Sequence, residues 1–143
     1  MDFKDKVVWI TGASSGIGKA VALALSAEGA CIIASARSEH KLEDIRGRTT
    51  NPDKFHIVTI DMASGQSIDS AVSEVLSTFP RIDILFNNAG ISQRALVLDT
   101  PEEVDRRIME VDYFGTVRLT KAILPRMIEQ GGGHILCTSS IVG

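Results

Sequence analysis

Three glycines stand between an apolar segment and a segment with helical periodicity, an arrangement that suits the binding of phosphate groups. The apolar segment is 7–11, and Gly12, Gly16 and Gly18 follow it. Glycine allows a tight turn and a close approach of a pyrophosphate to the backbone, and the N–H groups at a helix start attract its charge. A purely structural turn is the alternative interpretation. The spacing and its context favour a dinucleotide site.

The choice between dinucleotides depends on the residues that follow the second apolar segment, 30–35. A ribose 2′-hydroxyl favours Asp or Glu at this place, whereas a 2′-phosphate favours arginine. The chain has Ala36 and Arg37 there, and a guanidinium can bind phosphate through two hydrogen bonds. Ser14 and Ser15 of the glycine loop can add hydroxyl donors. We therefore expect NADP(H) rather than NAD(H), the alternative being that Arg37 is only a solvated loop residue.

The elements that position these residues alternate along the chain. Apolar runs predict buried strands, and stripes with steps of three and four predict helices between them. A long helix is expected to begin with Thr100 as its cap and Pro101 as its first residue, and its apolar stripe runs to Pro125. The alternation predicts one α/β domain over 1–143, a doubly wound parallel sheet in the order 3-2-1-4-5, with the ligand over the carboxyl ends of the strands. The five expected strands are 7–11, 30–35, 55–60, 82–86 and 134–138.

Composition argues against several kinds of partner. The 143 residues carry a formal net charge of −3 and no polybasic run, so nucleic acid and anionic membranes are not expected partners. The amino terminus is polar, and no apolar run approaches the ~18 residues of a spanning helix, which predicts a cytoplasmic protein.

The cysteines and histidines show no spacing typical of a metal or disulfide site. Cys31 and Cys137 fall in expected strands and are interpreted as small core residues. His40, His56 and His134 are far apart, and we expect them to be surface or hydrogen-bonded residues rather than catalytic ones. No metal is predicted.

Several separated segments together resemble the short-chain dehydrogenase/reductase family over essentially the whole chain. The segment 11–18 is similar to its cofactor loop, Asp61-Met62 to its adenine-contacting pair, and Asn87-Asn88-Ala89-Gly90 to its second motif. The segment 91–94 resembles the branch called dehydrogenase/reductase family member 7. The resemblance places the cofactor contacts at Gly12, Ser14, Ser15, Gly16, Ile17, Gly18, Arg37, Asp61, Met62, Asn88, Ala89 and Gly90.

The resemblance also implies hydride transfer between the nicotinamide and a small carbonyl or alcohol substrate. In the family a tyrosine is the acid or base, a lysine lowers its pKa, a serine binds the substrate oxygen and an asparagine supports a proton relay. The tail Ser-x-Val-Gly identifies Ser140 with the catalytic serine, with Ser139 as the alternative. Asp112 occupies the place of the relay asparagine, and whether it serves there is left open.

The tyrosine and lysine of the family are not found in this chain. The sole tyrosine is Tyr113, and the residue four positions later is Val117, so there is no Tyr-x3-Lys pair. We expect the amino-terminal part of a complete reductase, inactive by itself and without the carboxyl-terminal part of the family fold. The alternative is a naturally truncated, non-catalytic dinucleotide-binding or interaction module. The resemblance implies a homo-oligomeric parent, and an unpaired strand at 134–138 predicts that the isolated chain associates.

Overall fold

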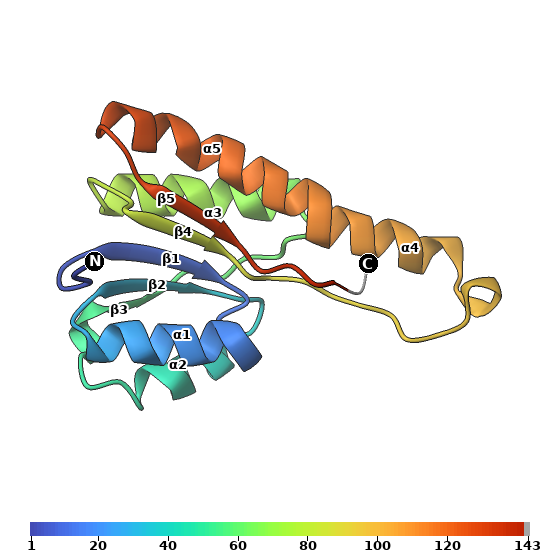
Figure 1. Ribbon diagram of the computed structural model, residues 1–143, viewed down its shortest axis with the longest axis horizontal. Helices are drawn as coiled ribbons and strands as arrows, with labels where there is room; N and C mark the ends of the chain where they lie inside the picture. The colour runs from blue at the N-terminus through green and yellow to red at the C-terminus, as the bar shows by residue number, and fades with distance from the viewer. Residues whose placement is uncertain (142–143) are drawn as a thin grey trace.

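A five-stranded parallel sheet forms the centre of the molecule in the computed structural model, which describes residues 1–141 (Figure 1). Its order is β3-β2-β1-β4-β5, and every neighbouring pair is parallel, as the alternation of segments predicts. The chain therefore starts in the middle of the sheet, builds outward to one side and then crosses to the other. The strands are β1 (Val7–Thr11), β2 (Cys31–Ser35), β3 (Phe55–Ile57), β4 (Ile84–Asn87) and β5 (His134–Cys137).

Helices cover both faces of this sheet. On one face lie α1 (Gly16–Ala27) and α2 (Glu39–Arg46), and on the other lie α3 (Gly65–Thr78) and a long composite helix (Figure 1). The composite helix consists of α4 (Glu102–Met109), the π-helical segment η3 (Glu110–Gly115) and α5 (Thr116–Glu129). Two 3₁₀ turns, η1 (Pro52–Lys54) and η2 (Val97–Asp99), lie in connections.

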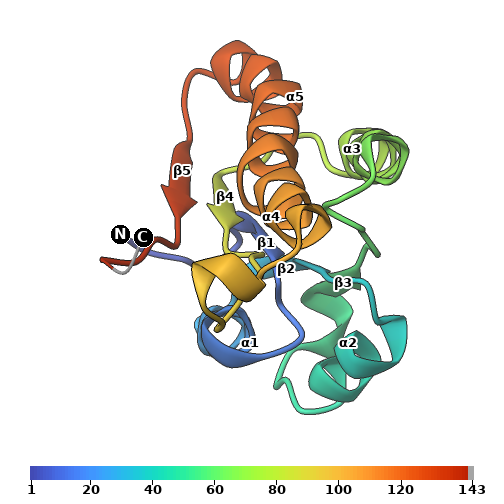
Figure 2. The ribbon, with the colours of Figure 1, turned by 90° about the vertical axis from the view of Figure 1, so that its right-hand side faces the viewer.

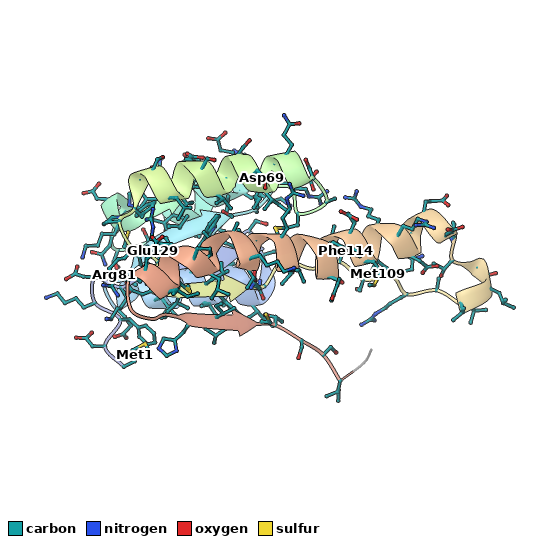
Figure 3. All side chains as sticks on the ribbon, turned by 90° about the horizontal axis from the view of Figure 1, so that it is seen from above. Met1, Asp69, Arg81, Met109, Phe114 and Glu129 are labelled. Carbon is teal, nitrogen blue, oxygen red and sulfur yellow. The ribbon has the colours of Figure 1, made fainter. Side chains whose placement is uncertain are left out.

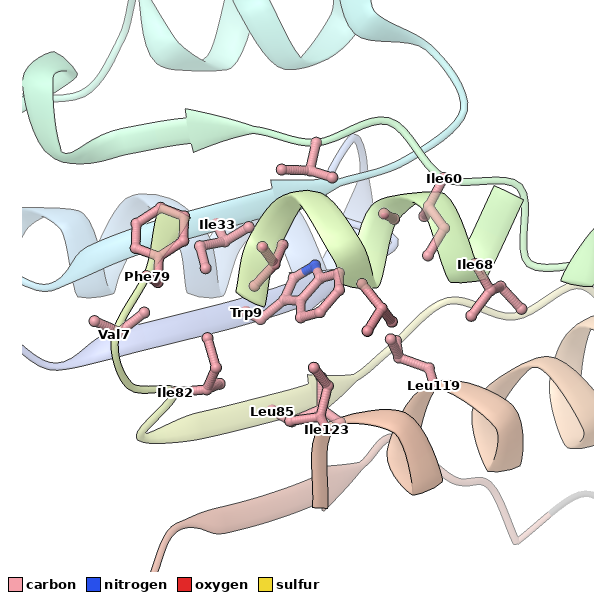
Figure 4. Packing of buried hydrophobic residues seen from close by; sticks show 14 of the residues in the cluster. Val7, Trp9, Ile33, Ile60, Ile68, Phe79, Ile82, Leu85, Leu119 and Ile123 are labelled. Atoms are coloured by element: carbon pink, nitrogen blue, oxygen red, sulfur yellow. The ribbon is translucent and has the colours of Figure 1, made fainter. Parts of the chain in front are cut away.

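The core is divided into two clusters because successive residues of a strand point to opposite faces. Val7 and Trp9 of β1 belong to the cluster under α3 and α5, whereas Val8 and Ile10 belong to the cluster under α1 and α2. Figure 4 shows Trp9 among the side chains of the first cluster. The indole is fully buried, and its Nε1 donates a hydrogen bond of 2.8 Å to Ser35 Oγ on the neighbouring strand. Both faces of β1 are thus closed to water.

The expectation about the start of the composite helix was wrong. Thr100 does not cap α4: its hydroxyl donates to the carbonyl of Leu96, and Pro101 holds the cap position. The composite helix continues past Pro125, where the expected apolar stripe ends, and stops at Glu129, just before the glycines 131–133. Strand β3 is also shorter than expected and ends at Ile57, although Val58 and Ile60 still donate backbone hydrogen bonds toward the β2 side.

Of the two cysteines, Cys31 packs against the core under α3 and α5, whereas Cys137 is not the core residue that the sequence predicts. Cys31 is half-buried and Cys137 is exposed. The reason for Cys137 is its position on β5, an edge strand whose residues are all exposed. Among the histidines, His56 is half-buried and packs edge to face on Phe79, with ring centroids 5.0 Å apart, while the others are exposed. Within residues 1–141, no helix is long and apolar enough to cross a membrane.

Candidate cofactor site

Two adjoining cavities lie at the carboxyl ends of the strands, the edge that faces the viewer in Figure 2. We call them the Arg37 cavity and the Ser140 cavity. They share part of their lining, including Gly12, Ser15 and Ala89. The Arg37 cavity is further lined from the glycine loop, the segments that follow β2 and β3, and the composite helix. The Ser140 cavity is further lined from the start of α1, the end of β4 and the turn after it, the composite helix, and β5 with the residues after it. An elongated ligand could therefore cross from one cavity to the other over the glycine loop.

The glycine loop between β1 and α1 has the backbone conformation that glycine alone adopts readily. Gly12 has φ +65° and Gly16 has φ +54°. A Cβ atom on Gly12 would stand 2.9 Å from Cα of Ala89, whereas one on Gly16 would meet no atom within 4 Å. Gly12 is therefore needed for packing against the chain after β4, and the open side of Gly16 leaves room for a ligand. Gly18 lines neither cavity; a Cβ there would collide with the carbonyl of Gly12.

The start of α1 offers backbone donors to this space. Ser15 holds the N-cap position in an extended conformation, and its side chain makes no capping hydrogen bond. The first N–H groups of a helix have no partner within the helix, and they carry the positive end of its dipole. Ile17 is 58% exposed beside them and lines the Ser140 cavity. This end of α1 can bind a phosphate, as the sequence pattern predicts.

Hydrogen bonds tie the ends of three strands together under the site. Thr11 Oγ1 at the end of β1 accepts from the backbone N–H groups of Asn88 and Ala89, each at 3.0 Å. The Asn88 side chain donates to the carbonyl of Gly12 at 3.3 Å and accepts from Thr138 Oγ1 at 2.7 Å. These contacts hold the ends of β1, β4 and β5 together and fix the floor between the two cavities. The sequence did not predict the hydrogen bond that Thr138 donates to Asn88.

Arg37 is the second residue after β2 and lines the Arg37 cavity. Its side chain is exposed and makes no ion pair with any residue of 1–141. Ser14, Asp61 and Met62 line the same cavity. Asp61 Oδ1 accepts from the backbone N–H of Ala63 at 3.0 Å, which fixes the orientation of the carboxylate. The lining thus combines two guanidinium groups, from Arg37 and Arg107, with hydroxyls and one carboxylate.

Asp112 and Ser140 line the Ser140 cavity, together with Ser139. Asp112 lies in the π-helical segment η3, and its Oδ1 accepts from the backbone N–H of Ile91 at 2.8 Å. This acceptor role is one that an asparagine oxygen could also fill, so Asp112 supports the turn after Gly90 whatever else it does. Val142 and Gly143, which contribute to the identification of Ser140 by its motif, lie outside the described residues.

Every predicted site residue except Gly18 lines one of the two cavities. Gly18 instead packs against the glycine loop. The structure also adds residues that sequence reasoning missed. Arg107 and Val111 of the composite helix line the Arg37 cavity. Their spacing of four residues, which places two side chains on the same face of a helix, was the signal that could have identified them.

Comparison with known proteins agrees with this geometry. A family model described as short chain dehydrogenase matches residues 6–143. Human dehydrogenase/reductase SDR family member 7 is 43% identical over 147 aligned positions, which cover 99% of this chain and 43% of that protein. Member 7B from Xenopus laevis is 42% identical, with coverage of 96% and 45%. The chain therefore spans less than half the length of these curated relatives.

Solved structures show the same fold. A short-chain dehydrogenase from Streptomyces avermitilis superposes with a TM-score of 0.90 at 38% identity, covering 98% of this chain and 51% of that one. The L-sorbose reductase from Gluconobacter frateurii, solved in complex with NADPH and L-sorbose, has a TM-score of 0.89 at 34% identity, with coverage of 99% and 55%. From the order of its sheet, its glycine loop and these matches, the chain belongs to the short-chain dehydrogenase/reductase family and resembles the branch of family member 7.

Proposed function

We propose that the protein is an NADP(H)-dependent oxidoreductase that transfers hydride between the nicotinamide and a carbonyl or alcohol substrate. The observation that carries the proposal is the Arg37 cavity. There a guanidinium without an ion-pair partner in 1–141 lies with Ser14 beside the glycine loop, and Ala36 stands where a ribose 2′-hydroxyl would call for a carboxylate. The complex of the L-sorbose reductase with NADPH supports a nicotinamide dinucleotide in this fold.

The residues divide the binding of the cofactor between them. Arg37 and Ser14 would bind the 2′-phosphate, and the first turn of α1 would bind the pyrophosphate. Asp61 and Met62 would contact the adenine, and Asn88-Ala89-Gly90 would lie along the nicotinamide ribose. When bound, the cofactor supplies or accepts the hydride. Ser140 would then donate a hydrogen bond to the substrate oxygen as negative charge develops on it.

Asp112 either supports the turn after Gly90 or takes part in a proton relay, and its hydrogen bond with Ile91 favours the structural role. Because Oδ1 already accepts the Ile91 N–H at 2.8 Å, the carboxylate is held as an acceptor. We propose that Asp112 keeps the turn after Gly90 in place. A relay role would rest on its backbone carbonyl, as the family resemblance implies for the residue at this place.

A non-catalytic dinucleotide-binding module is the second candidate function. The observation that favours it is that most of the described lining is suited to holding a dinucleotide: the glycine loop, Arg37 and the turn at Asn88. Under this alternative these residues bind the cofactor without turnover. Hydride transfer in the assay described next would separate the two functions.

Calorimetric titration of the purified protein with NADPH and with NADH tests the proposal. We expect tighter binding of NADPH, and Arg37→Asp should weaken NADPH by about 10-fold to 100-fold while leaving NADH nearly unchanged, because one charge-assisted contact contributes about 1.5–3 kcal/mol. An equal loss of both cofactors in this variant would refute the assignment of Arg37. Absorbance at the reduced nicotinamide band, recorded with a panel of small carbonyl compounds, then reports turnover.

The state of assembly belongs to the same proposal. Met109 and Phe114 are about half-exposed on the composite helix, and both are labelled on its surface in Figure 3. We propose that the complete protein is a homo-oligomer that uses this helix. The cytoplasmic location expected from the polar amino terminus stays a prediction.

A further inference from the structure

We propose that Arg107 binds the adenine base of the cofactor and forms the α4 wall of its pocket. This inference rests on the proposed function and deepens it, because it adds a residue that acts on the part common to NADPH and NADH. It therefore separates affinity for dinucleotides in general, assigned to Arg107, from preference for the 2′-phosphate, assigned to Arg37.

The position of Arg107 is the first support. Arg107 lies on α4, 45 residues after Met62 in the sequence, yet it lines the same cavity as Asp61 and Met62. Val111, one helical turn further on, lines that cavity too and is only 6% exposed. One face of the composite helix therefore stands over the loop after β3. The long side chain of Arg107 comes from the outer, exposed end of that face.

A comparison with the neighbouring residue Arg106 is the second argument for this role of Arg107. Arg106 pairs with Glu102, four residues earlier, at 2.7 Å. Glu103 stands at the same spacing from Arg107, in the orientation that favours an ion pair on a helix. Nevertheless, Arg107 makes no ion pair within 4.0 Å in the described part of the chain. Its guanidinium is available to a ligand, whereas that of Arg106 is already engaged.

The chemistry of the lining indicates which part of the ligand Arg107 meets. Ile60 and Met62 are 3% and 5% exposed, so together with Val111 they give the cavity apolar surfaces suited to a flat base. Arg37 and Ser14, which suit a phosphate, come from the glycine loop and the end of β2 instead. A planar guanidinium can lie on the face of an aromatic ring and is more weakly hydrated than an ammonium group. The adenine base is the part of the cofactor that fits between these surfaces.

Binding measurements on single variants test this assignment. Arg107→Ala should weaken NADPH, NADH and ADP by the same factor, about threefold to thirtyfold, the range expected for a guanidinium over a ring. Arg106→Ala is the matched control, because it removes the same side chain one residue away, and we expect its affinities to stay within about twofold of those of the unaltered protein. Arg107→Lys should recover only part of the loss, since it restores charge without the planar group.

The outcomes separate this inference from the proposed function. If the unaltered protein binds no dinucleotide, both are overturned. If it binds NADPH but Arg107→Ala leaves all three affinities unchanged, the inference fails and the proposed function stands. A loss confined to NADPH and 2′,5′-ADP, with NADH and ADP unaffected, would place Arg107 on the 2′-phosphate and would equally overturn the adenine assignment. Thermal unfolding of each variant, recorded without ligand, shows whether the altered chain is folded.

Discussion

At the scale of single residues, Thr11 shows how one buried hydroxyl positions a site that it does not line. It is 1% exposed and accepts two backbone hydrogen bonds from the turn after β4. We expect Thr11→Val, which preserves the shape, to lower the free energy of unfolding by about 2 kcal/mol, because two N–H groups lose their acceptor. Urea denaturation measures this change. Thr11→Ser is the control and should lose less than half as much; equal losses would show that the methyl group, not the hydroxyl, matters.

The glycines of the loop should respond differently to substitution, because their surroundings differ. Gly16→Val should abolish dinucleotide binding, since the side chain would occupy the open space reserved for the pyrophosphate. Its cost in stability should be about 1–2 kcal/mol, from the left-handed backbone alone. Gly18→Ala should cost more, about 3 kcal/mol, because its Cβ would collide with the carbonyl of Gly12.

Denaturation and calorimetry on the same two variants measure stability and binding separately. Gly47→Ala is the control, because Gly47 has a right-handed helical backbone and ordinary contacts of 3.5 Å or more. A Gly16→Val protein that still binds NADPH would contradict the position that we give to the pyrophosphate.

At the scale of elements, the strands were more predictable than the long helix. A continuous apolar run such as that of β1 indicates a strand that is buried on both faces. The residue types alone are enough to predict such a strand. The composite helix also has a clear apolar stripe, but this stripe does not predict the π-helical segment at Glu110–Gly115, where the helix meets a residue distant in sequence. Gly115 lies so close to the carbonyl of Met62 that a Cβ atom would overlap it.

Contacts between residues distant in sequence also explain why Arg107 was not predicted as a site residue. The cofactor loop and the turn at Asn88 are local motifs, whereas the contribution of Arg107 arises from packing of the composite helix over the loop after β3. The exposure of Cys137 likewise depends on what lies beside β5 and not on the apolar character of that strand.

Gly115 provides a test at this scale. Gly115→Ala should push the composite helix away from Met62 and lower the free energy of unfolding by about 2 kcal/mol or more, since neither the carbonyl nor the helix backbone can yield cheaply. Because Met62 and Val111 both line the Arg37 cavity, affinity for NADPH should fall as well. Calorimetry and urea denaturation measure the two effects. A variant more stable than the original, as the higher helix propensity of alanine alone would give, would contradict the close contact.

At the scale of the whole molecule, Asp83 couples stability to pH. It joins the starts of β1 and β4: Oδ2 accepts from Val7 N–H at 2.9 Å, and Oδ1 pairs with Arg81 at 2.7 Å. Burial opposes ionisation of the carboxyl, but the Val7 hydrogen bond and the Arg81 guanidinium outweigh it, and the pKa of Asp83 lies below its ordinary value. A depressed pKa stabilises the fold above the unfolded pKa of about 4 and loses that effect as the pH falls through the folded value.

The expected result is a free energy of unfolding that declines below about pH 4 in the unaltered protein and declines less in Asp83→Asn. At pH 7 this variant should be less stable by about 2 kcal/mol, because the charged partner of Arg81 is gone. Denaturant titrations at a series of pH values measure both. The exposed pair of Asp69 and Arg118 offers a control, since both side chains are more than half exposed and Asp69→Asn should change little. Identical pH profiles for the unaltered protein and Asp83→Asn would contradict the role of this carboxyl.

The surface around β5 determines how copies of the 143-residue chain behave together. Among residues 1–141, strand β5 pairs only with β4, and Ile135 and Leu136 are 39% and 48% exposed. On α5, which precedes β5, Ile128 is 69% exposed. An edge strand with exposed apolar side chains offers both unpaired backbone groups and apolar area to another chain. We therefore expect this polypeptide to associate at micromolar concentration.

Sedimentation velocity over a range of concentrations measures the association. Leu136→Lys should shift the population toward monomer, because a charge on an edge strand opposes pairing with a second strand. Lys41→Glu, on the opposite face at α2, should leave association unchanged and serves as the control. If Ile128→Lys dissociates the assembly while Leu136→Lys does not, the contact is made by the composite helix, as we propose for the complete protein. A monodisperse monomer for the unaltered chain would instead show that neither the open edge nor the helix is sufficient for self-association.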